Sequence, residues 1–141
     1  DVAVVAATLT DTGTISFNDL DLTNTHTVSV VKASGTLGGT LALGSVSEDA
    51  TTTAGSAPWT YSVANSATQY LAAGQIASEV FTVTITDVNG ATVTQDVTIT
   101  ITGTNDTPTI TSGSSGTVAE NAATTTVIYT ASATDVDTSD T

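Results

Sequence analysis

Apolar and polar residues alternate along much of the chain, so that many segments have one apolar face and one face rich in threonine. Over residues 79–86 the apolar positions are Phe81, Val83 and Ile85, and over residues 92–102 valine and isoleucine alternate with threonine and other polar residues. Alternation with a period of two is the pattern of a half-buried strand, because successive side chains point to opposite faces. The two segments therefore predict two strands.

The sequence between these segments predicts a hairpin. It reads DVNG (residues 87–90), and Asn-Gly is a strong hairpin signal because both residues tolerate a positive φ. The second strand would then place four residues on its inner face: Val93, Val97, Ile99 and Ile101.

Shorter alternating segments precede this hairpin. Gly38 and Gly39 predict a turn, residues 47–57 a polar loop, and residues 65–74 one helical turn between two strands. About seven short strands with turn signals every 8–12 residues indicate an all-β protein, an antiparallel β-sandwich of immunoglobulin type. The earlier strands are predicted around Ile15 and Phe17, around His26, Val28 and Val30, around Leu41 and Leu43, and around Trp59, Tyr61 and Val63.

Composition supports this fold class. Threonine makes up about a quarter of the 141 residues, and threonine and valine suit a pleated, half-buried surface. Hydrophobic residues are 39% of the chain and the mean hydropathy is +0.21, which argues against intrinsic disorder. The absence of cysteine excludes thiol catalysis, disulfides and zinc–thiolate sites.

The charge of the chain is strongly one-sided. Fourteen acidic residues face a single basic one, Lys32, and the formal net charge is −13. This charge argues against binding to nucleic acid or to an anionic membrane surface. No apolar segment approaches the roughly 20 residues of a membrane span, so we expect no membrane insertion.

A domain boundary is predicted just after the last strong strand. Residues 102–108 contain glycine and proline and precede a new extended segment at residues 109–111. Beyond it the sequence parallels its own beginning, since residues 106–110 resemble residues 1–5 and residues 134–137 resemble residues 18–21. We therefore expect a complete repeat over residues 1–105, and over residues 106–141 a linker with the first strands of a following, incomplete repeat.

Several of these motifs resemble known bacterial repeats. The motifs DTGTISFNDLDL (residues 11–22), WTYSV (59–63), QYLAAGQ (69–75) and TGTND (102–106) resemble the VCBS repeat of large RTX adhesins. Residues 107–141 resemble the start of a cadherin-like repeat. The resemblance implies an immunoglobulin/cadherin-like sandwich, export by a type I secretion system, an extracellular or cell-surface location and calcium at the linkers. Asn24 departs from the VCBS pattern, which more often has aspartate there.

Nine of the fourteen acids lie beside the two ends of the predicted repeat. Consecutive sandwiches of this kind meet end to end, which would gather these carboxylates at the poles, where they would repel unless a cation neutralised them. Calcium takes six to eight oxygen ligands and accepts carboxylates, amide carbonyls and backbone carbonyls. The alternative is that these residues only form turns and keep the protein soluble. The predicted C-terminal Ca²⁺ site is Asn105, Asp106, Glu120, Asp135 and Asp137, and the N-terminal one is Asp1, Asp11, Asp19 and Asp21, completed by a preceding repeat.

The sequence offers little for catalysis. Its one histidine, His26, shares a face with Val28 and Val30, and we expect a buried or edge histidine bonded to the backbone. No nucleophile–base pair supports a hydrolase, so we expect no enzyme.

Three functions fit these observations. The first is a calcium-rigidified extender, or spacer, in a secreted bacterial adhesin, whose partners are adjacent repeats or neighbouring identical subunits. The second is a subunit of an extracellular filament joined by β-strand donation from residues 107–141. The third is a glycan- or ice-binding module, although Thr98, Thr100 and Thr102 are more simply the solvent face of a strand.

Overall fold

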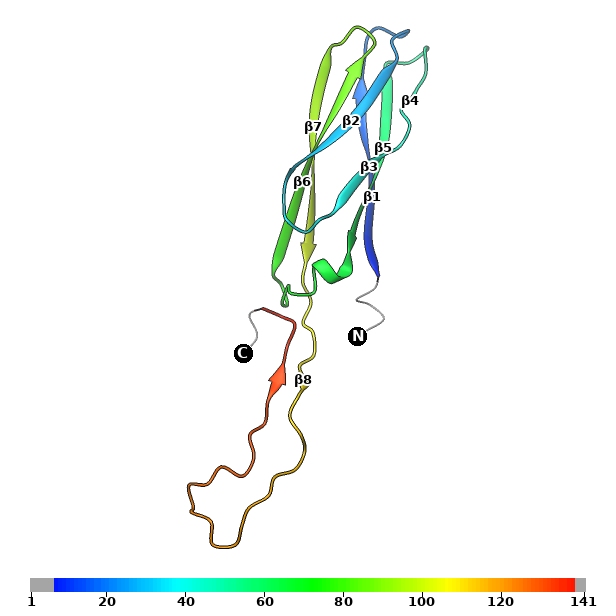
Figure 1. Ribbon diagram of the computed structural model, residues 1–141. Coiled ribbons are helices and arrows are strands. Elements are labelled where there is room, and N and C mark those ends of the chain that lie inside the picture. The colour runs from blue at the N-terminus through cyan, green and yellow to red at the C-terminus, as the bar shows by residue number, and fades with distance from the viewer. Residues whose placement is uncertain (1–6, 139–141) are drawn as a thin grey trace.

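The computed structural model describes residues 7–138, and within them two antiparallel sheets face each other as a β-sandwich (Figure 1). This confirms the predicted all-β class. The first sheet has the order β1-β5-β3, with β4 also paired to β5, and the second has the order β2-β6-β7. The strands are β1 (Thr8–Asn18), β2 (His26–Ser34), β3 (Thr40–Leu43), β4 (Ser47–Glu48), β5 (Ala54–Ala64), β6 (Ile76–Asp87) and β7 (Thr92–Thr102).

The core lies between the inner faces of the two sheets. Phe81, Val83 and Ile85 of β6 are buried, as the alternation predicts, and Val83 is fully enclosed. Tyr61 of β5 reaches across from the other sheet, and its ring meets that of Phe81 edge-on at 5.8 Å between centroids. Burial of these apolar side chains is the main force holding the sheets together.

The inner face of β7 is covered over only part of its length. Val97 and Ile99 are buried, but Val93 has 57% of its surface exposed. Val93 lines an open pocket with Phe17 and Ile85 at the start of the strand. The alternation marks which face is apolar, but it does not tell how far the opposite sheet extends over that face.

The hairpin between β6 and β7 is present, with a longer loop than a two-residue turn. Residues 88–91 form it, and Gly90 alone among them has a positive φ, of +89°. Asp87 closes the loop, because its Oδ1 accepts the N–H groups of Asn89 at 2.9 Å and Ala91 at 2.8 Å. Of the Asn-Gly pair, only the glycine adopts a positive φ.

Two segments before the hairpin also differ from the prediction. The polar loop at residues 47–57 contains β4 and the start of β5. At the start of β5, Gly55 lies against the Phe17 ring. A Cβ at this position would lie 2.3 Å from that ring, so only glycine allows the two to approach this closely. The helical turn is a three-residue 3₁₀ segment, η1 (Asn65–Ala67).

The strand order matches the immunoglobulin arrangement with one position unfilled. The sheets β1-β5-β3 and β2-β6-β7 correspond to strands B-E-D and C-F-G of that fold, and no strand within residues 7–138 takes the position of strand A. Consequently β1 begins and β7 ends at the same end of the sandwich (Figure 1). We call this end the linker pole and the opposite end the far pole.

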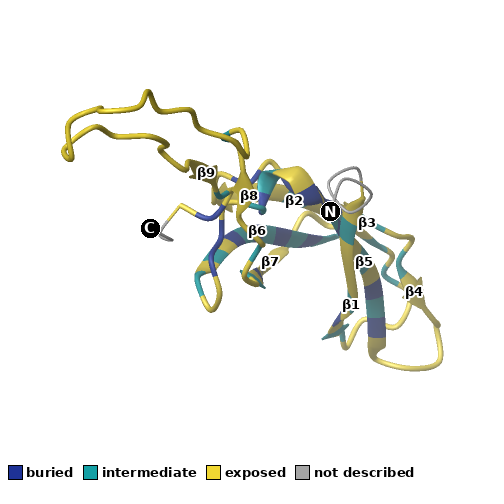
Figure 2. Cartoon of the chain, turned by 90° about the horizontal axis from the view of Figure 1, so that it is seen from below, coloured by how far each residue is buried: buried dark blue, intermediate teal, exposed yellow. Residues whose placement is uncertain are grey.

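Residues 103–138 continue from the linker pole. Two short strands, β8 (Thr109–Ile110) and β9 (Ala133–Thr134), pair with each other, and residues 111–132 extend away from the sandwich between them (Figure 1). Almost all of this excursion is exposed (Figure 2). The chain then returns, and the N–H and Oγ1 of Thr138 both donate to the carbonyl of Tyr70, at 3.2 and 3.0 Å.

The single described helix, η1, has three residues, so no helix among residues 7–138 could cross a membrane.

Candidate metal centre at the linker pole

Three of the predicted calcium ligands lie together at the linker pole. The N–H of Asp106 donates to Oδ2 of Asp137 at 2.9 Å, although 31 residues separate the two in the chain. The N–H of Asp137 in turn donates to Oδ1 of Asp135 at 3.0 Å. The pairing of β8 with β9 and the contact of Thr138 with Tyr70 hold the two segments in this position.

Asp137 is the least ordinary of these residues. It is only 4% exposed, and its Oδ1 is buried with no hydrogen-bond partner in the described structure. A buried carboxylate oxygen without a partner is costly, because it has lost its water and gained nothing in return. Lys32 does not compensate it, since that side chain pairs with Glu79. An orphaned carboxylate oxygen of this kind fits a cation ligand.

An open cavity adjoins Asp106 and Asp135. Its volume is about 600 Å³, and the amide and hydroxyl groups on its wall are further oxygen donors of the type that calcium accepts. Asn105 belongs to this wall, and its side-chain amide donates to the carbonyl of Asp106. The wall consists of Ser66, Gln69, Asn105, Asp106, Thr107, Thr109, Thr134, Asp135 and Val136.

The carboxylates are not assembled as a finished cage. Within residues 7–138, no group of three or more histidine, aspartate or glutamate side chains is placed to hold a metal ion. The reason is visible in the contacts, since the carboxylates of Asp135 and Asp137 accept backbone N–H groups. Glu120 is not part of the group: it lies in the excursion of residues 111–132, which extends away from the pole (Figure 1).

The predicted N-terminal set is divided between different parts of the sandwich. Asp11 lies within β1 opposite Tyr61, whereas Asp19 and Asp21 follow the end of β1 at the far pole. The residues from Asp11 to Asp19 run along an extended strand at about 3.3 Å per residue, which places these two carboxylates far beyond the span of one ion. The expectation that they share a site is corrected on this point. Asp1 lies outside the described residues.

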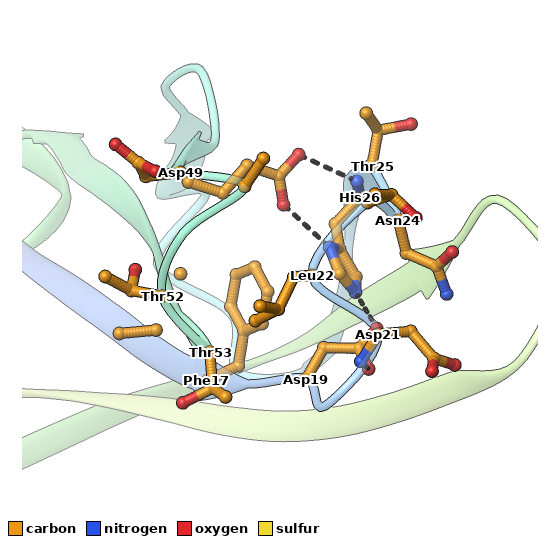
Figure 3. Close-up of a pocket in the computed structure, with 15 residues that line it drawn as sticks. Phe17, Asp19, Asp21, Leu22, Asn24, Thr25, His26, Asp49, Thr52 and Thr53 are labelled. Carbon is orange, nitrogen blue, oxygen red and sulfur yellow. Dashed lines mark hydrogen bonds and ion pairs between the residues drawn. The ribbon is translucent and has the colours of Figure 1, made fainter.

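At the far pole, Asp19 has a different partner, His26. His26 Nε2 lies 3.1 Å from Oδ2 of Asp19, and Nδ1 lies 2.7 Å from Oε2 of Glu48 (Figure 3). The N–H of His26 also donates to Oε1 of Glu48 at 3.0 Å. The imidazole is 8% exposed and its centroid lies 4.7 Å from that of the Phe17 ring. We call these three residues, Asp19, His26 and Glu48, the histidine clamp.

Each ring nitrogen of His26 faces a carboxylate oxygen, and the pKa values of both carboxyl groups are lowered. The pKa of Glu48 lies below its ordinary value because His26 donates to it through its ring and its backbone. The pKa of Asp19 is also lowered, first by the N–H of Asp21 and then by His26.

The clamp was not foreseen from the sequence. The ring of His26 is 8% exposed and lies on an edge strand, in keeping with the expectation, but the predicted bonds of its side chain to the backbone were wrong, because the ring contacts two carboxylates. Glu48 lies 22 residues further on in the segment predicted as a loop. No local pattern marks this pairing, because it depends on the register of β4 on β5.

Comparison of the chain with models of known protein families gives no match, and comparison with curated proteins gives none either.

Proposed function

We propose that this chain is a calcium-rigidified extender module of a large secreted bacterial surface adhesin. Its partners would be adjacent repeats of the same polypeptide or neighbouring identical subunits, outside the cell and after export by a type I system. The observation that carries the proposal is the buried, unpartnered Oδ1 of Asp137 beside Asp106 at the point where the chain leaves the sandwich. The resemblance of residues 1–106 to VCBS repeats supports the cellular setting.

The residues that would hold calcium are Asn105, Asp106, Asp135 and Asp137. Bound calcium would supply positive charge between carboxylates that otherwise repel. Asp106 belongs to the segment leaving β7, whereas Asp135 and Asp137 belong to the returning segment after β9. Ligands from both segments would fix the direction of residues 103–138 relative to the sandwich. The module would thereby hold distance between its neighbours.

Calcium titration of the whole chain tests the proposal. We expect binding with a dissociation constant of about 10⁻⁴–10⁻³ M, the range of extracellular modules, in isothermal titration calorimetry. Small-angle scattering should then show a narrower distribution of particle lengths with calcium than with chelator. Asp137→Asn should weaken binding at least tenfold, because it removes the charge of the buried carboxylate.

The matched control is Asp96→Asn. Asp96 lies on β7, where its Oδ1 accepts from Oγ1 of Thr82 at 2.7 Å, and it is exposed. The variant removes the same charge away from the linker pole, so calcium affinity should stay near that of the parent chain. Equal affinity in Asp137→Asn and the parent chain, or identical scattering with calcium and chelator, would contradict the proposal.

A second candidate, a filament subunit joined by strand donation, is favoured by the exposed tail. Val127 is 76% exposed, Ile128 53% and Tyr129 44%, and all three lie in the excursion that pairs with no strand of the sandwich. Consecutive exposed apolar residues are suited to pairing with the strand edge of another copy.

Sedimentation of the full chain tests this candidate. At raised salt, which screens the charge of −13, we expect assembly that grows with concentration and is weakened by Ile128→Asp. Val88→Asp is the control, because Val88 is 65% exposed in the β6–β7 loop, outside the donated segment. A monomer at all concentrations would exclude the filament.

A further inference from the structure

The only lysine of the chain lies on the inner face of β2, although 30% of its side-chain surface remains exposed. Lys32 lies on β2 with the same parity as Val28 and Val30, which pack against the core from the inner face of that strand. The register of β2 on β6 is irregular between Lys32 and Ser34. Such irregularities redirect side chains locally. A chain with fourteen acids thus brings its one amine, which is partly exposed, to the side of β2 that faces the other sheet.

That amine meets a carboxylate that is sealed from solvent. Glu79 of β6 is 0% exposed and lies on the same inner face as Phe81 and Val83. Nζ of Lys32 contacts Oε1 of Glu79, and the hydroxyl of Tyr61 donates to Oε2 at 2.8 Å. One carboxyl group is therefore held between an amine on one oxygen and a phenol on the other.

The loop between β2 and β3 closes over this group. A Cβ on Gly39 would lie 2.2 Å from Oε2 of Glu79 and from the hydroxyl of Tyr61, and one on Gly35 would lie 2.6 Å from Cγ of Glu79. Two glycines thus allow the loop to cover the carboxyl group and to exclude water from it. Exclusion of water matters because water would hydrolyse or outcompete any acyl chemistry at this carbon.

We propose that Lys32 and Glu79 are a site of intramolecular amide formation that joins β2 covalently to β6. In this step a proton moves from Nζ to Oε1, the uncharged amine attacks Cδ of Glu79, and a bond forms between Nζ and Cδ. The bond between Cδ and Oε1 breaks, and one water leaves with the protons released by the amine. The Tyr61 hydroxyl stabilises the negative charge that develops on Oε2. No oxidant, reductant or further reactant is needed.

The burial of Glu79 favours amide formation and also limits its rate. An amide is neutral, so it removes the buried charge of Glu79, which the interior solvates poorly. Burial works to raise the pKa of Glu79, but the hydrogen bonds of Lys32 and Tyr61, the charge of Lys32 and the backbone N–H of Leu37 together outweigh it and hold the pKa below its ordinary value. The resting state is therefore the ion pair. The proton must return to Oε1 before attack, which makes the reaction a slow maturation after folding.

The single lysine makes the test simple. The chain contains one lysine and no arginine, so trypsin has one cleavage site, after Lys32, and amide formation destroys it. We expect the folded chain, after incubation at neutral pH, to be lighter by one water molecule in intact mass spectrometry. After denaturation in urea it should resist trypsin. The unreacted chain is cut into residues 1–32 and 33–141.

Two variants separate the reaction from a simple ion pair. Lys32→Arg keeps the positive charge but lacks a nucleophilic amine, so it should keep the full mass and be cut completely. Tyr61→Phe should lower the rate of water loss about 100-fold, the usual effect of removing one such donor. A parent chain that retains its full mass and is cut completely after prolonged incubation would overturn the proposal and leave an ion pair. Calcium and chelator should give the same result, so this outcome is independent of the linker pole.

Discussion

At the scale of single residues, Gly39 shows how a missing side chain supports a buried polar group. A Cβ at this position would lie 2.2 Å from both Oε2 of Glu79 and the hydroxyl of Tyr61. Neither atom can move away without losing the hydrogen bond that joins them. The glycine is therefore required by the closeness of the carboxyl group rather than by a turn.

We expect Gly39→Ala to lower the free energy of unfolding by about 2 kcal/mol, because the added methyl overpacks the site and disturbs a buried hydrogen bond. Urea denaturation followed by Trp59 fluorescence measures this. Gly113→Ala is the control, since a Cβ at Gly113 would meet no atom within 4 Å. An equal effect of the two substitutions would contradict the tight packing around Glu79.

At the scale of elements, the two-residue strand β4 depends on the histidine clamp. Glu48 is one of its two residues and accepts hydrogen bonds from both the ring and the backbone N–H of His26. So short a strand forms few backbone hydrogen bonds, and its main long-range contacts are with β5 and the clamp. The clamp therefore ties β4 to the start of β2.

Acid should release β4. The pKa values of Glu48 and Asp19 are lowered in the folded protein, so the clamp stabilises the fold above the ordinary carboxyl pKa of about 4 and is lost as the pH falls through the lowered values. We expect His26→Gln to lower the free energy of unfolding clearly at pH 6 and much less at pH 3. Denaturant titrations of both proteins at the two pH values measure this. A difference that grows toward pH 3 would mean that the clamp does not act through ionised carboxylates.

The strands that the sequence predicts best are those in which apolar and polar residues alternate regularly. Residues 92–102 were expected as a strand, and β7 has those bounds, because each apolar residue alternates with a polar one. The start of β5 at Ala54 was missed, since its small residues carry no alternation. These residues pair because Phe17 covers Gly55, a contact between segments almost forty residues apart.

The candidate site was predictable to a similar extent. Asp106 and Asp137 meet because β8 pairs with β9, which brings the segment before β8 beside the segment after β9. Glu120 and Asp11 were assigned from their proximity in sequence to the junctions, yet one lies in the excursion and the other within a strand. Proximity to a junction in the sequence therefore does not determine whether a side chain lies near that junction in space.

At the scale of the whole molecule, the two poles differ in how their acids are compensated. The far pole has His26 between Asp19 and Glu48, whereas at the linker pole the carboxylates of Asp135 and Asp137 accept backbone N–H groups. We therefore expect divalent ions to act mainly on the linker pole and protons mainly on the far pole.

The direction of the strands has a mechanical consequence. Because β1 begins and β7 ends at the same pole, tension between Thr8 and Thr102 would peel each outer strand from its neighbour one residue pair at a time. Tension between Asn18 and Thr102 would instead act along the strands and load many pairs at once. The chain has no cysteine, so cysteines introduced at these positions provide unique handles for force spectroscopy. We expect a lower unfolding force for the first pair of handles, and equal forces would contradict it.

A domain pulled in this way loses its strand pairs one after another, beginning at the linker pole. The force needed to separate the first pairs would depend on the contacts at that pole. An ion held by Asp106 and Asp137 would raise this force, because it would have to be released first. The strength of such a module under flow would then be set by the composition of the surrounding fluid as much as by the sandwich itself.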